Sequence, residues 1–214
     1  MCGRPVIFNE IREHADAVLC TWWLGSEAGN AICNVLWGEY NPSAKLPMTF
    51  PAHVGQIPIY YQNKSTGRPT ALKQTYKASY IDASTEPAYP FGYGLSYTDF
   101  GYSDLKLLPG KAAGVHTEVS VKVTNTGKCA GEEVVQLYVQ DKVASVTRPI
   151  KELKGFRKIH LNAGESKTVV FQITDDALGF YDNEMNYMVE PGDFVFMVGG
   201  SSDDVQQITY NLEE

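Results

Sequence analysis

The chain has 214 residues, of which 43% are hydrophobic and 20% are charged, a composition typical of globular proteins with enough length to bury a core. Its formal net charge of −7 argues against a nucleic-acid partner, because phosphate recognition depends on clustered Lys and Arg. No run of about 18 apolar residues occurs, so we expect no membrane span. Enzymes and binding modules both remain open.

The cysteines and the acidic pairs do not predict a metal site. The four cysteines have no CxxC spacing and no histidine at metal-ligand distance: Cys2, Cys20, Cys33 and Cys129. Cys20 and Cys33 lie in apolar runs, which predicts small buried side chains. The pairs Glu132–Glu133 and Asp203–Asp204 fit no calcium-binding loop and predict solvated surface. We therefore expect no metal and no cofactor.

The first hundred residues predict α/β structure. Gly3–Phe8 begins abruptly, like a strand entered partway, and Asn9–Ala15 predicts a short helix. Ala17–Trp23 is a nearly continuous apolar run, typical of a strand that is covered on both faces. Apolar residues at helical spacing in Ala31–Leu36 predict a second helix, which Gly38 ends.

A long irregular stretch follows these elements. Met48–Phe50 predicts a short strand, and Pro51–Ser84 has no periodicity. Its tyrosines are spread through polar sequence: Tyr60, Tyr61, Tyr76 and Tyr80. An irregular stretch of this length is usually functional or lies across a partner surface.

Glu86–Phe100, which we call the connector, predicts a stiff and buried joint between two regions. Its prolines disfavour helix, while Gly92 and Gly94 permit backbone angles that other residues avoid. Large rings stand among them, whereas a flexible tether would be rich in Gly, Ser and charge. We therefore expect these rings to pack against the regions on both sides.

After the connector the apolar residues alternate with period two, which predicts strands. The predicted strands are Tyr102–Leu108, His116–Thr124, Glu133–Gln140, Lys167–Ile173, Asp193–Val198 and Val205–Asn211. Short strands separated by Gly, Asn and Asp turns indicate an antiparallel β-sandwich of immunoglobulin-like type. The Cys…Trp…Cys pattern of true immunoglobulin domains is absent.

Six motifs follow one another along the chain: Gly3–Pro5, Trp22–Ala31, Gly38–Pro47, Gly55–Pro58, Tyr89–Tyr97 and Arg148–Phe156. In order and spacing they resemble glycoside hydrolase family 3, the β-glucosidase and β-xylosidase group, and above all its periplasmic bacterial β-glucosidases. Family members resemble one another in having a (β/α)8-like barrel, an α/β sandwich domain and a fibronectin type III-like domain. The resemblance implies that residues 1–98, connector included, are the C-terminal part of the α/β sandwich domain. Residues 99–214 would be the fibronectin type III-like domain.

The resemblance also implies what the chain lacks. In the family the Asp nucleophile lies in the barrel, and the Glu acid/base lies upstream of the strand that corresponds to Gly3–Pro5. Neither has a counterpart here, so we expect no catalytic residue in this chain and no activity from it alone. The parent would be a periplasmic or secreted enzyme that hydrolyses terminal β-glucosides with retention and needs no cofactor.

One turn of the first region is a candidate sugar-binding site. Its residues are Trp22, Trp23, Ser26 and Glu27. They lie between a predicted strand and a predicted helix, where α/β sheets place ligands, and the indole rings offer a stacking surface. The alternative is that Ser26 and Glu27 only cap the helix. No second carboxylate is placed to complete the pair that retaining glycosidases hold about 5–5.5 Å apart.

Three functional hypotheses follow. The first is the C-terminal fragment of a β-glucosidase, whose substrate is a β-linked gluco-oligosaccharide or glucoside. The first hundred residues hold 15 aromatic residues against 10 in the remainder. This excess predicts either stacking on sugars or, the interpretation that we favour, contacts with domains missing from this chain. The second is a stand-alone module that binds glycan or protein without catalysis, and the third is a structural accessory domain.

Overall fold

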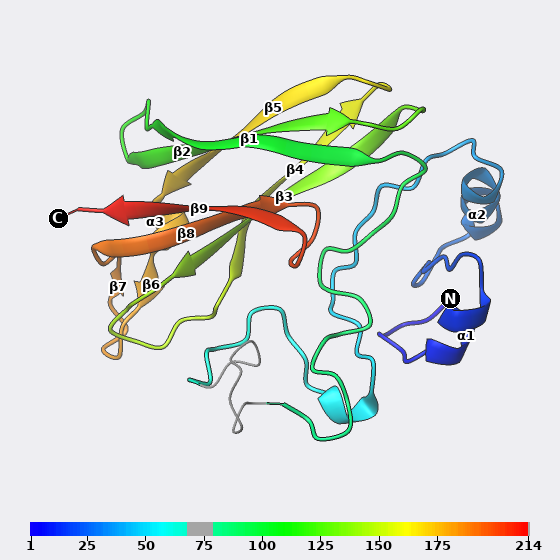
Figure 1. The fold of residues 1–214 in the computed structure, drawn as a ribbon, viewed down its shortest axis with the longest axis horizontal. Coiled ribbons are helices and arrows are strands. Elements are labelled where there is room, and N and C mark those ends of the chain that lie inside the picture. The colour runs from blue at the N-terminus through cyan, green and yellow to red at the C-terminus, as the bar shows by residue number, and fades with distance from the viewer. Residues whose placement is uncertain (68–78, 214) are drawn as a thin grey trace.

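The structure is a computed structural model and describes residues 1–67 and 79–213. A β-sandwich from the second half of the chain lies beside an N-terminal region of helices and loops (Figure 1). The helical elements are α1 (Asn9–His14), α2 (Ala28–Leu36), the 3-10 helix η1 (Val54–Gln56) and α3 (Asp175–Leu178). None of the described helices is long and apolar enough to cross a membrane.

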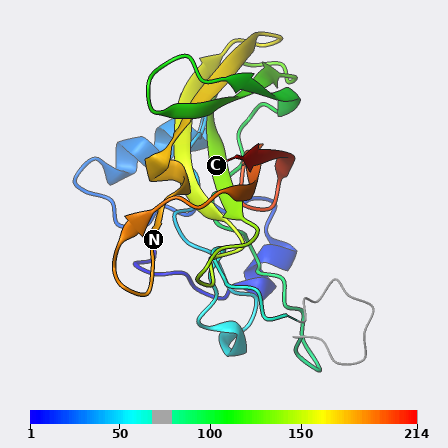
Figure 2. The same cartoon turned by 90° about the vertical axis from the view of Figure 1, so that its left-hand side faces the viewer.

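Two antiparallel sheets form the sandwich (Figures 1 and 2). Their strands are β1 (Phe100–Pro109), β2 (Val115–Asn125), β3 (Gly131–Asp141), β4 (Glu152–Leu161), β5 (Ser166–Thr174), β8 (Gly192–Gly199) and β9 (Val205–Leu212). One sheet has the order β1-β2-β5 and the other the order β4-β3-β8-β9, while β6 (Phe180–Tyr181) and β7 (Tyr187–Met188) form a small ribbon. All six strands predicted after the connector are present, which confirms the fold class of this half. β4, β6 and β7 were not predicted.

The core between the sheets consists of the side chains that the period-two pattern selects. They include Val119, Val121 and Val123 of β2 and Val135, Leu137 and Val139 of β3, each at most 3% exposed. Successive side chains of a strand point to opposite faces, so the alternation turns one whole set inward. Removing this apolar surface from water, at roughly 25 cal/mol per Å², is the main favourable contribution to the fold.

The outer face of the β4-β3-β8-β9 sheet is buried as well. Tyr138 of β3 is fully buried there. It forms a second apolar cluster with Val195, Met197, Tyr61 and Phe91. The ring of Phe91 stacks on Tyr61 at 4.3 Å between centroids, and Tyr61 meets Tyr138 edge-on at 5.7 Å. Both faces of β3 are therefore covered, one by the opposite sheet and the other by the connector with Tyr61.

The backbone of the connector reaches this outer face at Gly92. Its φ of 79° lies in the left-handed region, and a β-carbon there would collide with the side-chain amide of Gln136. That amide is 3% exposed and donates to the carbonyls of Gly92 at 3.1 Å and Gly200 at 2.6 Å. The N–H of Ser202 donates to the carbonyl of Phe91 at 2.9 Å. Both the angle and the space at this position therefore require glycine.

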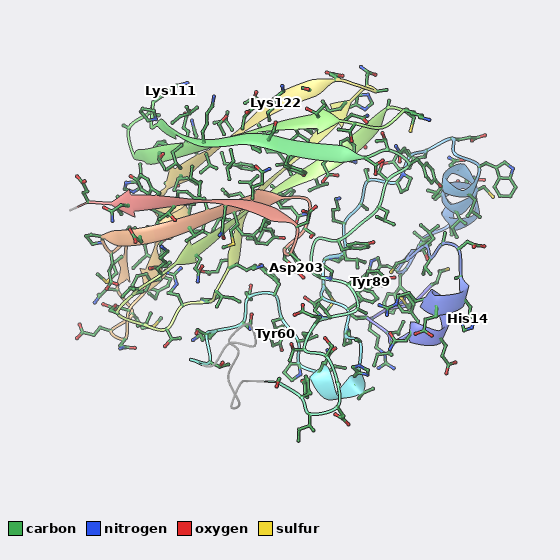
Figure 3. All side chains as sticks on the ribbon, viewed as in Figure 1. His14, Tyr60, Tyr89, Lys111, Lys122 and Asp203 are labelled. Atoms are coloured by element: carbon green, nitrogen blue, oxygen red, sulfur yellow. The ribbon has the colours of Figure 1, made fainter. Side chains whose placement is uncertain are left out.

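On its other side the connector contacts the N-terminal region. The N–H of Leu46 donates to the carbonyl of Tyr93 at 2.8 Å, and Phe50 forms an antiparallel bridge with Tyr89. The ring of Tyr89 stacks on Phe8 at 5.9 Å, on the side of the connector that faces the N-terminal helices (Figure 3). The prediction that the connector's rings pack against both regions is confirmed.

A buried glutamine forms hydrogen bonds to both ends of the long irregular stretch before the connector. Gln56 is 3% exposed, and its Oε1 accepts from the N–H groups of Ala52 at 2.7 Å and His53 at 3.3 Å. Its Nε2 donates to the carbonyls of Ser84 and Glu86, both at 3.0 Å. The two ends of the stretch thus meet at one side chain. Residues 68–78, among them Tyr76, lie outside the described residues.

The strands predicted in the first hundred residues do not form. Within the described residues, Gly3–Phe8 and Ala17–Trp23 join no sheet, and Met48–Phe50 supplies only the bridge at Phe50. Val18 and Leu19 are 49% and 41% exposed, so the prediction of a strand covered on both faces is wrong. A strand needs a neighbour for its N–H and C=O groups, and the described residues supply none to these segments.

The helices predicted in this region are confirmed. α1 occupies all but the last residue of the predicted Asn9–Ala15. α2 ends at Leu36, and Gly38 follows with a φ of 77° and donates its N–H to the carbonyl of Val35. The helical periodicity and its glycine stop signal were sufficient to place this element.

The cysteines of this region are less buried than predicted. Cys20 is half-buried and Cys33 is exposed, so the prediction that both are small buried side chains is wrong. Both lie in the part of the chain whose apolar runs find no covering sheet among the described residues.

We predict that Phe91→Ala and Gly92→Val each destabilise the chain severely, whereas Glu86→Ala changes almost nothing. Phe91 is partly buried against Tyr138, so its truncation should approach the cost of about 3–5 kcal/mol that removal of a fully buried aromatic has. A β-branched residue at Gly92 meets both a strongly disfavoured φ and the side chain of Gln136. The side chain of Glu86 is exposed, so its loss should stay within about 0.5 kcal/mol. Urea unfolding of the three variants beside the parent measures this. Equal midpoints in all four would mean that the connector is a plain linker.

We also predict that the sandwich depends on the connector for stability. A polypeptide of residues 100–214 keeps β1 whole but uncovers Tyr138, whereas residues 86–214 retain Phe91 over it. The shorter polypeptide should therefore unfold at lower urea concentration and bind more of a hydrophobic dye. Tyr61 is missing from both, so the comparison isolates the connector. Identical midpoints and dye binding would contradict a supporting role.

Candidate functional site

The turn that carries the predicted sugar-binding residues has two differently placed tryptophans. Trp22 has a φ of 51°, rare for a bulky residue, and its ring meets Phe50 edge-on at 5.9 Å. Trp23 is 82% exposed and lies over Gly3, where an added β-carbon would come within 2.5 Å of the indole. Trp22 thus packs inward while Trp23 presents its ring outward, which leaves a stacking surface open.

Glu27 lies at the start of α2, but its side chain does not cap the helix, contrary to the capping alternative. It occupies the N-cap position, but its side chain makes no capping hydrogen bond to the backbone. Its Oε2 accepts instead from Nδ2 of Asn30 at 2.6 Å. Ser26 and Glu27 are both exposed, so their remaining polar atoms face solvent. A carboxylate at a helix N-terminus is still favoured by the helix dipole.

This turn holds no two-carboxylate arrangement. No hydrogen bond or ion pair among the described residues brings a second carboxylate to Glu27. Among all the described residues, no group of three or more His, Cys, Asp or Glu side chains could hold a metal ion. The turn can therefore offer a ring and a hydrogen-bonding carboxylate to a sugar, but it cannot supply both nucleophile and acid/base.

Several buried polar side chains lie where the N-terminal region meets the sandwich. Nζ of Lys45 lies 3.1 Å from Oε2 of Glu133 on β3 and donates to the carbonyl of Gly94 at 3.2 Å. The hydroxyl of Tyr102 donates to Oε1 of Glu133 at 2.8 Å. Burial, followed by the nearby Glu133 carboxylate, raises the pKa of Tyr102 above its usual range. The prediction that Glu132–Glu133 is solvated surface is wrong for Glu133, which is 4% exposed.

The neighbouring Glu132 lies at the more exposed edge of the same contact. Nζ of Lys158 lies 2.7 Å from Oε2 of Glu132, and this hydrogen bond is the main cause that lowers the pKa of the carboxyl. The hydroxyl of Ser43 donates to the same oxygen at 3.2 Å. Asp203 of the other acidic pair is exposed, as predicted, and lies 3.7 Å from Nζ of Lys151 (Figure 3).

Asn41 joins three segments at the same contact between the N-terminal region and the sandwich. We call this contact the seam; its polar residues are Asn41, Ser43, Lys45, Glu132 and Glu133. Its Oδ1 accepts from the hydroxyl of Ser96 and the N–H of Tyr97, both at 2.8 Å, and its Nδ2 donates to the carbonyl of Ala130 at 3.0 Å. The hydroxyl of Tyr97 in turn donates to the carbonyl of Val35 in α2 at 2.5 Å. α2, the connector and the turn before β3 are therefore fixed to one another. Asn41, Ser43 and Lys45 all come from one motif, which is the signal that could have located this seam.

Comparison with known proteins defines the class to which the chain belongs. Residues 1–97 match the model of the glycosyl hydrolase family 3 C-terminal domain, and residues 133–202 match that of the fibronectin type III-like domain. The chain belongs to glycoside hydrolase family 3, of which it contains the C-terminal portion.

Individual relatives are similar along almost the whole chain. The periplasmic beta-glucosidase of Salmonella typhimurium is 49% identical over 215 residues, which cover 99% of this chain and 28% of that protein. A beta-xylosidase of Formosa agariphila is 44% identical over 99% of this chain and 29% of its own length. The crystal structure of a Listeria innocua beta-glucosidase in complex with glucose is 42% identical, with a TM-score of 0.92, over 99% of this chain and 30% of that one. The chain thus spans less than a third of these relatives.

We predict that the buried pair of Lys45 and Glu133 is far more sensitive than an exposed pair. Glu133→Ala leaves a largely buried ammonium group without its partner, which costs about 3–5 kcal/mol. The matched control is Lys142→Ala, whose partner is Asp193 and whose side chain is 43% exposed, with a change of at most about 1 kcal/mol. Urea unfolding measures both. Equal effects of the two substitutions would show that the seam contributes no more than surface contacts do.

Proposed function

We propose that the chain is the C-terminal part of a β-glucosidase that hydrolyses terminal β-glucosides with retention. The observation that carries this proposal is the similarity, along almost the full chain, to beta-glucosidases crystallised with glucose and with laminaribiose. The parent enzyme would act on β-linked gluco-oligosaccharides or glucosides. Similarity to a periplasmic beta-glucosidase supports a periplasmic or secreted location for it.

The residues of this chain fit a supporting role in the enzyme, in which another part supplies the catalytic groups. Retaining hydrolysis needs a nucleophile and an acid/base about 5–5.5 Å apart, and the turn around Glu27 provides one carboxylate only. The barrel and the remainder of the α/β sandwich domain would supply both catalytic groups. We propose residues 1–98 as the part that joins that domain and residues 99–214 as the fibronectin type III-like support.

The exposed aromatic residues fit such a partner. Trp23, Leu36 and Trp37 are 82%, 61% and 77% exposed on the N-terminal region, which is more apolar surface than a finished domain usually leaves open. We propose that the barrel or the remainder of its domain covers part of this surface. Trp22, Trp23, Ser26 and Glu27 would border the sugar cleft formed there, with Trp23 as the ring that stacks on a glucosyl unit.

We predict that the isolated chain does not hydrolyse an aryl β-glucoside, because it lacks nucleophilic and acid/base groups worth orders of magnitude in rate. A chimera in which this chain replaces the matching portion of the Salmonella relative should regain measurable turnover. The control chimera carries Gly92→Val and should lose folded protein. Turnover by the isolated chain, or an inactive chimera that is folded, would contradict the proposal.

The same samples test the alternative of a stand-alone binding module. Calorimetric titration of the isolated chain with laminaribiose should give no saturable binding if the sugar cleft needs the remainder of the enzyme. Saturable binding that Trp23→Ala abolishes, combined with an inactive chimera, would favour the module.

A further inference from the structure

The β6-β7 ribbon presents two tyrosine rings to solvent. Tyr181 of β6 and Tyr187 of β7 lie directly opposite each other in the antiparallel pairing, and they are 58% and 45% exposed. Their ring centroids are 5.2 Å apart with an interplanar angle of 63°. We call these two residues the tyrosine pair. The ribbon lies on the side of the sandwich away from α1 and α2 (Figure 1).

Contacts with the backbone before β6 hold Tyr187 in one orientation. Its hydroxyl donates to the carbonyl of Asp175 at 3.1 Å. Its ring lies against Gly179, where an added β-carbon would collide with it. The edge of one tyrosine ring meets the other, so the two support each other. A ligand would therefore meet rings that are ordered before it binds, which lowers the entropic cost of binding.

The turn between the two strands is also held by a side chain. Oδ1 of Asp182 accepts from the N–H groups of Glu184 at 2.8 Å and Asn186 at 2.9 Å, and Oδ2 accepts from Nδ2 of Asn186 at 3.2 Å. The hydrogen bond from the backbone of Asn186 is the main cause that lowers the pKa of the Asp182 carboxyl. A two-stranded ribbon is only marginally stable by itself, so these contacts fix the position of the exposed rings.

Carboxylates of α3 lie beside the hydroxyl end of Tyr187. Burial, followed by the nearby carboxylates of Asp176 and Asp175, raises the pKa of Tyr187 above its usual range. Nε2 of His116 lies 2.6 Å from Oδ1 of Asp175, whereas Asp176 is exposed. Ionised carboxylates accept hydrogen bonds and donate none, so this surface suits a ligand rich in hydroxyl groups and disfavours an anionic one.

We propose that the tyrosine pair binds a β-linked glucan chain, with a glucosyl ring stacked on Tyr181 and its hydroxyls donating to Asp175 and Asp176. An aromatic face with a few placed polar groups is the usual composition of a small-ligand site. A purely apolar partner would leave the carboxylates desolvated without hydrogen bonds, which costs free energy. The choice of glucan rests on the proposed function, because relatives were crystallised with glucose and with laminaribiose.

The test is native gel electrophoresis of the full chain with and without laminarin, the polymeric β-glucan built from the laminaribiose unit. A polymer presents the same unit many times, so contacts too weak to saturate with a disaccharide add up to a measurable retardation. We expect laminarin to retard the parent chain. Tyr181→Ala should lose this retardation, whereas Tyr181→Phe, which keeps the ring, should retain most of it. Dextran, an α-linked glucan, should retard none of them.

Two matched controls remove exposed rings elsewhere. Phe156→Ala on β4, where the ring is 66% exposed, and Trp23→Ala, where it is 82% exposed, should both be retarded like the parent. Urea unfolding of every variant shows whether a lost retardation reflects lost folding. Because the gel requires no catalysis, an inactive chimera would contradict the proposed function without changing this result.

Three outcomes would overturn the proposal. The first is a parent chain that laminarin does not retard, or that dextran retards equally. The second is folded Tyr181→Ala that is retarded as strongly as the parent. The third is a retardation that Trp23→Ala abolishes, which would place the glucan at the tryptophan turn instead.

Discussion

The arrangement of this molecule depends on covering the outer face of the β4-β3-β8-β9 sheet. A strand at the middle of a sandwich normally has one face in the core, whereas β3 has a fully buried tyrosine, Tyr138, on the other face too. Phe91 and Tyr61 complete that second layer, and both belong to the region before the sandwich. The boundary between the two regions is therefore a packed core, and the N-terminal region cannot move away from the sandwich without exposing it.

Polar groups determine where the two regions meet on this face. The buried Gln136 amide fits only against a backbone without a β-carbon, and Glu133 needs the ammonium of Lys45 at one oxygen and the hydroxyl of Tyr102 at the other. Apolar contacts tolerate sliding, but buried hydrogen-bonding groups that lose their partners cost free energy at once. The tyrosine and phenylalanine rings bury apolar surface between the two regions, and these polar groups select a single register.

The sequence predicted a segment well where its hydrogen-bonding and packing partners lie within this chain and in a regular pattern. The strands whose partners lie within the chain were read from alternation, but β4 was missed because charged residues and Phe156, 66% exposed, obscure its pattern. The run Ala17–Trp23 has the composition of a buried strand but no paired neighbour among the described residues. The burial of Glu133 was not predictable, because its partner Lys45 lies 88 positions earlier. For the candidate turn, the sequence named the residues but could not show that Trp22 faces inward and Trp23 outward.

The buried amide of Gln56 has a consequence for how this family can diversify. It accepts from the backbone at the start of the irregular stretch and donates to the backbone at its end, so one side chain holds the two ends together. The entropic cost of closing a loop rises only slowly with its length. Tyr61, Asn63 and Lys64 contact the sandwich, so the part of the stretch that contains them is constrained as well. Insertions and deletions between Gly67 and Tyr80 can therefore accumulate during evolution while the sheets and the connector stay unchanged, which makes this part a place where related enzymes can acquire new surfaces.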